Sequence, residues 1–300
     1  MPATMTMHAD EIHTDDKLVT RLLAGQFPHW AHLLIQPVAS AGTDNALYRL
    51  GDDMVVRLPR IHGAVESLDK EHQWLPRLAP LLPVAIPGPL AKGAPAEGYP
   101  WHWSVYRWLE GENPTIDHHG DSRRLAADLA SFIAALQRID PMDGPPAARG
   151  GPLAARDQPT RAAIEALRGA VDTDAVTAAW EAALQVPPWR GQPVWVHADL
   201  APGNVLLVHQ RLGAVIDFSL AGLDDPACDL PIAWNLLPRS VRDLFRATLQ
   251  VDDATWVRGR GWALSIALIQ LPYYRDTNPG LASNARHVIR EVLTDHRRTR

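Results

Sequence analysis

The feature that most constrains the fold is a polar loop framed by short apolar segments in the second half of the chain. This loop, His197–Asn204, contains Asp199 and is followed directly by the apolar segment Val205–Val208. A second β-type segment, Ala214–Ile216, follows a turn over His209–Gly213 and leads into Asp217. Two such segments joined by a turn form a β-hairpin, which would return Asp217 to the side of Asp199. The chain must therefore fold so that side chains far apart in the sequence share one site.

The oxygen-bearing side chains of Asp199, Asn204 and Asp217 are the set that phosphoryl transfer from a nucleotide needs. One carboxylate accepts or orients the proton of the attacking hydroxyl, while a second carboxylate and an amide oxygen hold the Mg²⁺ that bridges the phosphates. A His-x-Asp sequence alone is common and usually structural. Followed by Asn204 and, after a hairpin, by Asp217, the His197-x-Asp199 sequence indicates a phosphotransferase site.

Composition excludes other classes of protein. With 300 residues, the chain can bury one large core or two modest ones. Its formal net charge of −5 argues against nucleic acid as a partner. The one cysteine, Cys228, excludes an internal disulfide and multi-cysteine metal sites. The N-terminus lacks the pattern of a secretory signal, and no apolar run reaches the roughly 20 residues that span a bilayer. We expect a cytoplasmic protein without a membrane partner, either a monomer or a weak homodimer.

The motifs of other nucleotide-binding and hydrolytic enzymes are absent from the sequence. None of the three lysines, Lys17, Lys70 and Lys92, lies in a GK[ST] sequence, which excludes a P-loop. No GxSxG, HExxH or complete GxGxxG sequence occurs either.

Residue patterns predict a β-rich first part and a helical second part. The elements expected in the first part are a helix over Thr14–Gly25 with Thr14 as N-cap and a helix over Val65–Leu78 that Pro76 ends or kinks. The expected strands are Asn45–Leu50, Met54–Leu58 and Trp101–Leu109, and the turn residues Gly51-Asp52-Asp53 join the first two in a hairpin. The helices expected in the second part are Ser122–Ile139, Thr160–Gly169, Thr173–Leu184 and Leu281–Asp295. The fold class is therefore predicted to be α+β.

Segments spread along the chain resemble the aminoglycoside phosphotransferase family, bacterial small-molecule kinases related in fold to protein kinases. The first part contains SAGTDNALYRLGDDMVVRLPR, KEHQWLPRL and SVYRWLEGE, and the second contains HADLAPGNVLL followed by GAVIDFSLAGLDDPACDL. These segments cover roughly residues 35–240. The resemblance implies a protein-kinase-like bilobal fold. Residues 1–108 would form a small lobe with an antiparallel nucleotide-binding sheet and one regulatory-type helix. Residues 109–300 would form a larger helical lobe with the catalytic loop and the acceptor pocket.

In the helical lobe, the resemblance implies a role for each polar residue of the loop. Asp199 is similar to the family's catalytic base, and His197 would orient the loop rather than react. Asn204 and Asp217 look like the Mg²⁺ ligands. Asp229 resembles the buried aspartate that accepts backbone N–H groups of the loop.

In the sheet lobe, the resemblance implies where the nucleotide binds. The corresponding residues are Ser40, Gly42, Thr43 and Asn45 in the loop over the phosphates, Arg57 and Glu71 in a strand–helix ion pair, and Arg107 to Leu109 in the hinge that binds the purine edge. The main departure is Arg57, because the family's best-known members carry a lysine on this strand. Arginine is permanently charged and forks two hydrogen bonds onto phosphate, but it is geometrically stricter than lysine.

The function implied by the resemblance is transfer of the γ-phosphoryl group of ATP or GTP, with Mg²⁺, to a hydroxyl of a small molecule. An aminoglycoside is the default acceptor of the family. A macrolide, nucleoside or peptide antibiotic, or a metabolite similar to choline or homoserine, is an alternative. Tyr273, Tyr274 and Asp276 are the candidate acceptor residues, because tyrosine stacks on rings and aspartate attracts ammonium groups. The competing explanation for these three residues is an ordinary helix end.

Two further classes of protein stay open on the sequence. A catalytically idle nucleotide binder is suggested by the arginine at position 57. A metal hydrolase would be built on His197 and Asp199 and would need a transition metal instead of a nucleotide.

Overall fold

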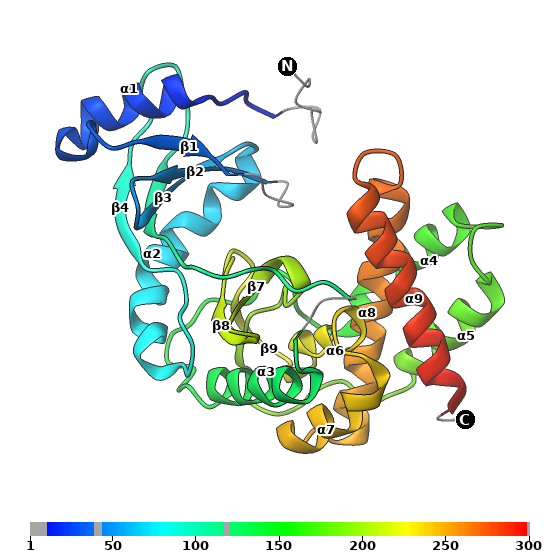
Figure 1. The fold of residues 1–300 in the computed structure, drawn as a ribbon. Helices are drawn as coiled ribbons and strands as arrows, with labels where there is room; N and C mark the ends of the chain where they lie inside the picture. Colours follow the sequence, from blue (N-terminus) through cyan, green and yellow to red (C-terminus); the bar gives the residue numbers. More distant parts are fainter. Residues whose placement is uncertain (1–10, 39–43, 117–119, 299–300) are drawn as a thin grey trace. The chain divides into compact units, whose positions relative to one another are not determined.

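The computed structural model describes residues 11–38, 44–116 and 120–298 (Figure 1). The chain divides into two compact units. The first comprises residues 1–111 together with 213–219, and the second comprises residues 112–212 together with 220–300. The assignment of residues 1–108 and 109–300 to functional lobes stays a prediction.

The first unit is built on a five-stranded antiparallel sheet. Its strands are β1 (Ile35–Pro37), β2 (Asn45–Leu50), β3 (Met54–Pro59), β4 (Pro89–Gly93) and β5 (Trp103–Arg107), in the spatial order β1-β2-β3-β5-β4. The predicted hairpin is present, and Gly51 in its turn has φ +58°, a conformation that glycine adopts without steric cost. The register sets Arg57 opposite Leu47 on one side and Ser104 on the other, in the middle of the sheet.

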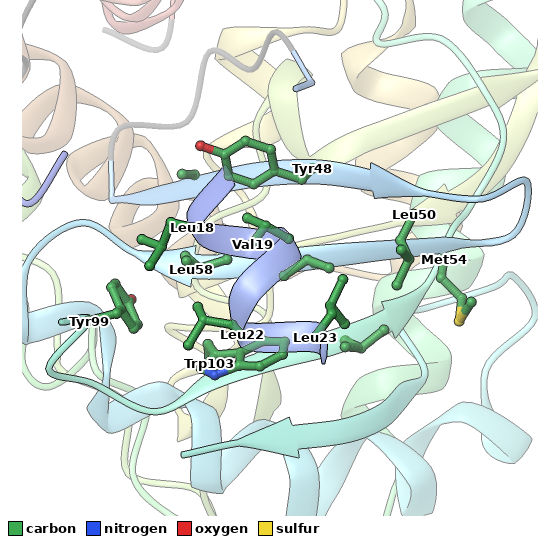
Figure 2. Close-up of a cluster of buried hydrophobic side chains, with 13 residues drawn as sticks. Leu18, Val19, Leu22, Leu23, Tyr48, Leu50, Met54, Leu58, Tyr99 and Trp103 are labelled. Carbon is green, nitrogen blue, oxygen red and sulfur yellow. The ribbon is translucent and has the colours of Figure 1, made fainter. Parts of the chain in front are cut away.

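One face of this sheet is covered by helix α1 (Asp16–Gln26). The helix buries Leu18, Val19, Leu22 and Leu23 at helical spacing. Figure 2 shows these side chains among those of the strands, with the Trp103 ring beside the end of the helix. Burying one such leucine stabilises a fold by about 1.5–3 kcal/mol, so this cluster is a main source of stability for the unit.

The N-cap of α1 differs from the sequence prediction. Asp15, not Thr14, caps the helix, and its Oδ1 accepts a 2.7 Å hydrogen bond from the N–H of Leu18. The Thr14 hydroxyl instead accepts a hydrogen bond of 3.0 Å from Tyr48. Both residue types cap helices well, so the choice depends on this tertiary contact.

The second helix of the first unit, α2 (Glu66–Leu78), carries a functional candidate on its buried face. Leu68, Leu75 and Glu71 are all buried. Pro76 stands inside the helix and does not end it. So close to the end of a helix, the missing N–H of proline removes one backbone hydrogen bond only.

The second unit is mostly helical. Its helices are α3 (Ser122–Gln137), α4 (Asp157–Ala166), α5 (Thr173–Leu184), α6 (Ile232–Asn235), α7 (Arg239–Leu249), α8 (Asp253–Tyr274) and α9 (Pro279–Arg298). Helix α8 is buried on most of its sides because it packs against α4, α5 and α9. A two-stranded antiparallel sheet of β6 (Val194–Val196) and β9 (Gly222–Asp224) carries the start of the polar loop.

The hairpin that follows the polar loop is tighter than predicted. Strands β7 (Val205–Val208) and β8 (Arg211–Val215) form a two-stranded sheet, whereas the sequence predicts a turn over residues 209–213. The turn is only His209-Gln210, with φ +49° and +63°. Positive φ at both positions defines a type I′ turn, whose twist matches that of the strands, although neither residue is typical of it.

These elements confirm the predicted α+β fold class, with an antiparallel sheet in the first unit and helices in the second. Among the described residues, no helix combines the length and hydrophobicity needed to cross a membrane.

Candidate active site

The polar loop leaves β6 at Val196 and turns at once through a strained backbone. Ala198 has φ +64°, in the left-handed region that residues with a Cβ adopt at a cost. His197 is completely buried, and its Nδ1 accepts a hydrogen bond of 3.2 Å from the N–H of Asp199. Because this nitrogen accepts, the ring fixes the backbone next to Asp199 instead of presenting a proton to solvent.

Asp229, in the 3₁₀ turn Pro226–Asp229, holds the strained backbone in place. Its Oδ2 accepts from the N–H of His197 at 3.0 Å, and its Oδ1 accepts from the N–H of Ala198 at 2.7 Å. The carboxyl group is completely buried. Burial raises the pKa of Asp229, and the nearby His197 and the two N–H bonds offset only part of that rise.

Asp199 and Asn204 contact each other across the loop. The side-chain amide of Asn204 donates to the backbone carbonyl of Asp199 at 2.8 Å and to its Oδ2 at 3.1 Å. This orientation assigns nitrogen to the atom that faces Asp199, which leaves the amide oxygen of Asn204 as its possible metal ligand. The Asp199 side chain is 29% exposed, so its carboxylate is partly open to solvent.

The second oxygen of Asp199 contacts a residue that the sequence did not point to. Arg149 forms an ion pair with Asp199 Oδ1 through its Nη1. It lies in the Pro- and Gly-rich loop between α3 and α4, and it is the one basic residue between Arg138 and Arg156. That isolation was the available signal, but nothing local in the sequence indicates the partner.

Strand β9 fixes the loop that carries Arg149. Leu223 pairs with this loop through backbone hydrogen bonds to Pro145 at 2.8 Å and from Ala147 at 3.2 Å. The N–H of Gly151 donates to Asp224 Oδ2 at 2.7 Å, and a Cβ at Gly150 would overlap the same carboxylate. The loop therefore lies against β9, which pairs with β6, the strand that leads into the polar loop.

In the first unit, a buried polar cluster surrounds Arg57. Its Nη1 donates to both carboxylate oxygens of Glu71 at 2.9 Å, and its Nη2 lies 3.6 Å from Asp217 Oδ1. The Tyr106 hydroxyl also donates to Glu71. Burial by itself would lower the pKa of Arg57, but the carboxylates of Glu71 and Asp217 outweigh it and raise that pKa. Burial, assisted by Glu71, raises the pKa of Tyr106. Arg57 thus stays a cation although it is buried.

Asp217 adopts a left-handed backbone, with φ +62°. Its Oδ1 accepts from the N–H of Ser219 at 3.3 Å, and its side chain is 38% exposed. Lys70 donates to the carbonyl of Ser219 at 2.7 Å, and burial lowers the pKa of this lysine. Asp217 belongs to the first unit and Asp199 to the second, so the shared metal site stays a prediction.

The hinge segment has only part of its backbone free for a nucleotide base. The N–H of Arg107 donates to Gly88 at 2.9 Å, and that of Trp108 donates to Asp53 at 2.7 Å. Of the three predicted hinge residues, only Leu109 keeps a backbone N–H without a backbone acceptor in the described part of the chain.

The remaining nucleotide-loop and acceptor candidates are less constrained. Ser40, Gly42 and Thr43 lie outside the described residues, and Asn45 begins β2. Tyr273 and Tyr274 end α8, and their ring centroids are 4.7 Å apart. Asp276 follows the helix, and its Oδ2 lies 3.5 Å from Arg275 Nε. Tyr273 is 56% exposed.

Transition-metal chemistry finds no support in the side-chain arrangement. Within residues 11–38, 44–116 and 120–298, no three His, Cys, Asp or Glu side chains cluster as metal ligands would. The ring of His197 is buried and accepts from Asp199.

The chain resembles a known protein family over most of its length and one known enzyme over a short segment. A model of the phosphotransferase enzyme family matches residues 35–262. The aminoglycoside 3'-phosphotransferase of Escherichia coli is 36% identical over 58 residues, which are 19% of this chain and 21% of that protein. The matched segment thus spans about a fifth of the relative's length.

Solved structures share the fold over nearly the whole chain. The GDP and kanamycin complex of APH(2")-IIia has a TM-score of 0.72 and 21% identity, covering 92% of this chain and 98% of that chain. The GDP complex of wild-type aminoglycoside 2'-phosphotransferase-IIIa has a TM-score of 0.74 and 20% identity, covering 94% and 100%. The macrolide 2'-phosphotransferase MphH from Brachybacterium faecium, an apoenzyme, has a TM-score of 0.61 and 22% identity, covering 92% and 98%. This likeness confirms the predicted protein-kinase-like fold.

Proposed function

Since the chain belongs to the phosphotransferase enzyme family, we propose that it transfers the γ-phosphoryl group of ATP or GTP to a hydroxyl of a small molecule. The observation that carries this proposal is the catalytic loop, where Asp199 is fixed by His197, Asn204 and Arg149 yet stays partly exposed. A carboxylate held this firmly and open to substrate is suited to orient an attacking hydroxyl.

The reaction is an in-line displacement. The acceptor oxygen forms a bond to the γ-phosphorus, the bond from that phosphorus to the β–γ bridging oxygen breaks, and the nucleoside diphosphate leaves with the electron pair. The hydroxyl proton passes to Asp199. Arg149 holds one oxygen of that carboxylate, Oδ1, so the proton passes to Oδ2, which lies beside the Asn204 amide.

Asn204 and Asp217 are the proposed Mg²⁺ ligands. Both supply hard oxygen atoms, which Mg²⁺ prefers, and the amide nitrogen of Asn204 is already turned toward Asp199. When bound, Mg²⁺ would neutralise charge on the β- and γ-phosphates.

Arg57 is proposed to contact the nucleotide phosphates in place of the usual lysine. Glu71 fixes the guanidinium by two bonds of 2.9 Å, and Asp217 lies on its other side. Arginine presents its donors in a rigid fork, so the Nη2 group that does not face Glu71 can serve a phosphate. This arrangement argues against an idle nucleotide binder.

Relatives suggest the nucleotide and the acceptor class. GDP is named in two of the similar structures above, and ADP in that of APH(2'')-Ib. Kanamycin is named with the first of these, and two macrolide phosphotransferases are also similar. We propose ATP or GTP as donor, with the Leu109 N–H at the base, and an antibiotic or a hydroxylated metabolite as acceptor.

The test is release of ADP or GDP by the full chain with Mg²⁺ and a panel of hydroxylated acceptors. Asp199→Ala should lower acceptor-dependent turnover by about 10²–10⁴-fold, as expected for loss of a general base. Asp143→Ala, which removes an exposed carboxylate of the neighbouring loop, is the matched control and should retain full turnover. Undiminished turnover in Asp199→Ala would refute the assignment of the base.

A further inference from the structure

The second unit contains a cavity beside the junction of α6 and α7. It has a volume of about 260 Å³, and α9 closes its other side. Its lining combines apolar residues, among them Leu236 and Leu237, with the charged residues Arg239, Arg242 and Glu291. The cavity is smaller and more polar than most small-molecule sites, which have volumes of about 300–1,000 Å³, so it has room for one small polar group.

Two asparagine side chains near the cavity form hydrogen bonds to the proposed catalytic loop. Asn235, next to the lining residue Leu236, donates its side-chain amide to the carbonyl of Leu200 at 3.1 Å. On the other side, Asn113 donates to the carbonyl groups of Pro202, Gly203 and Val205 at 3.3, 3.0 and 2.9 Å. Ile116, three residues further along, lines the cavity. Two segments that line the cavity are therefore continuous with residues that hold the loop carrying Asp199.

Arg242 is the least expected residue of the lining, because it is charged and only 3% exposed. Its Nε donates to Ala233 at 2.7 Å, and its Nη2 donates to Glu291 at 2.7 Å and to Leu237 at 3.1 Å. Its Nη1 is buried and has no hydrogen-bond partner among the described residues. A buried donor on a charged group is normally satisfied, so this atom points to a missing acceptor.

The charges of the cavity favour an anion. Its one carboxylate, Glu291, is already paired with Arg242. Arg239 is exposed and has no ion-pair partner in the described part of the chain. A molecule with several ammonium groups would therefore meet an unpaired arginine and find no free carboxylate. A carboxylate or phosphate group would satisfy both guanidinium groups by charge-assisted hydrogen bonds.

We propose that this cavity binds a carboxylate or phosphate group of the acceptor, so that the substrate is a small hydroxylated anion rather than a polycationic aminoglycoside. The inference rests on the proposed phosphotransferase function, because it takes Asp199 as the site of phosphoryl transfer. Arg242 and Arg239 bind the anionic group, and the hydroxyl of the same molecule extends along the loop toward Asp199.

Binding is measured by calorimetry on the full chain saturated with Mg²⁺ and ADP, so that the nucleotide site is filled. Inorganic phosphate and acetate are the two probes, and they separate a phosphate from a carboxylate preference. Arg239→Gln should weaken binding of the preferred probe by about 10- to 100-fold, the loss expected for one charge-assisted hydrogen bond. Arg286→Gln, on the exposed side of α9, is the matched control and should change the affinity by less than about twofold. Because Arg242 also joins α6 to α7, Arg242→Lys is the second variant.

Turnover distinguishes failure of this inference from failure of the proposed function. Nucleoside diphosphate release is measured with hydroxy acids, sugar phosphates, neutral polyols and kanamycin, in the wild type and Asp199→Ala. Turnover with an anionic acceptor, with KM raised at least tenfold in Arg239→Gln, supports the proposal. Turnover that depends on Asp199 but uses only kanamycin or polyols overturns the inference and leaves the function intact. If neither probe binds saturably, or if Arg239→Gln binds as wild type, the anion site is refuted whatever the turnover.

Discussion

The buried ion pair of Arg57 and Glu71 stabilises the first unit, and its contribution to the free energy of unfolding can be measured. Glu71→Gln keeps the size of the side chain and an oxygen to accept from Tyr106, but it removes the charge that faces Arg57 through two bonds of 2.9 Å. Breaking a buried ion pair from one side costs about 3–5 kcal/mol, because the other charge stays buried without its partner. Asp217 lies 3.6 Å from Arg57 Nη2 and still offers a carboxylate. We therefore expect the free energy of unfolding to fall by about 3 kcal/mol, the lower end of that range.

The double variant Arg57→Met/Glu71→Gln separates this penalty from catalysis. Without the buried cation, it should recover to within about 1 kcal/mol of the wild type, while nucleotide-dependent turnover stays lost. Urea unfolding followed by tryptophan fluorescence measures the first quantity, and release of ADP or GDP measures the second. Glu66→Gln, at the exposed start of the same helix, is the control and should change stability by less than about 0.5 kcal/mol. A double variant no more stable than Glu71→Gln would refute the reasoning.

Three further outcomes follow from the contacts. Arg149→Ala should lower kcat/KM by about 10- to 100-fold, because it frees the Asp199 carboxylate. An unchanged melting temperature would show that the variant is folded, and unchanged kinetics would contradict a positioning role for Arg149. Burial raises the pKa of Asp229, so the folded chain holds this proton to a higher pH than the unfolded chain, and its stabilising contribution is lost as pH rises above the ordinary carboxyl range. The free energy of unfolding of the wild type minus that of Asp229→Asn should therefore fall as the pH rises. A difference that does not change with pH would contradict a raised pKa for Asp229. Gly93→Ala would place a Cβ within the Trp103 ring and should lower the melting temperature, whereas an unchanged melting curve would show that the ring moves aside easily.

Local sequence patterns predicted those helices and turns whose conformation depends mainly on their own residues. The helix over Thr173–Leu184 was predicted with its observed ends, and the hairpin around Gly51 was predicted from its turn residues. The prediction failed at His209-Gln210, since both residues take a left-handed backbone that their types rarely favour. The β7–β8 pairing imposes that conformation, and propensity did not indicate it.

The candidate site was predictable only in the segments that carry family motifs. Arg149 was missed because its position depends on the backbone pairing of its loop with Leu223. Arg242 was missed for a similar reason, since its role follows from burial between α6, α7 and α9 and not from neighbouring residues. Contacts between distant segments leave no local pattern in a single sequence.

The strained backbone at Ala198 and Asp217 connects these observations. A non-glycine residue in the left-handed region costs about 1–2 kcal/mol, and such strain persists only where surrounding contacts over-determine it. At Ala198 those contacts are the two hydrogen bonds to the buried Asp229, and at Asp217 they include the bond from the Ser219 N–H to its own carboxylate. The His-Ala-Asp sequence by itself does not supply them. The loop can hold the proposed base Asp199 in one orientation because Asp229, distant in sequence, stabilises a conformation that the loop would not adopt alone.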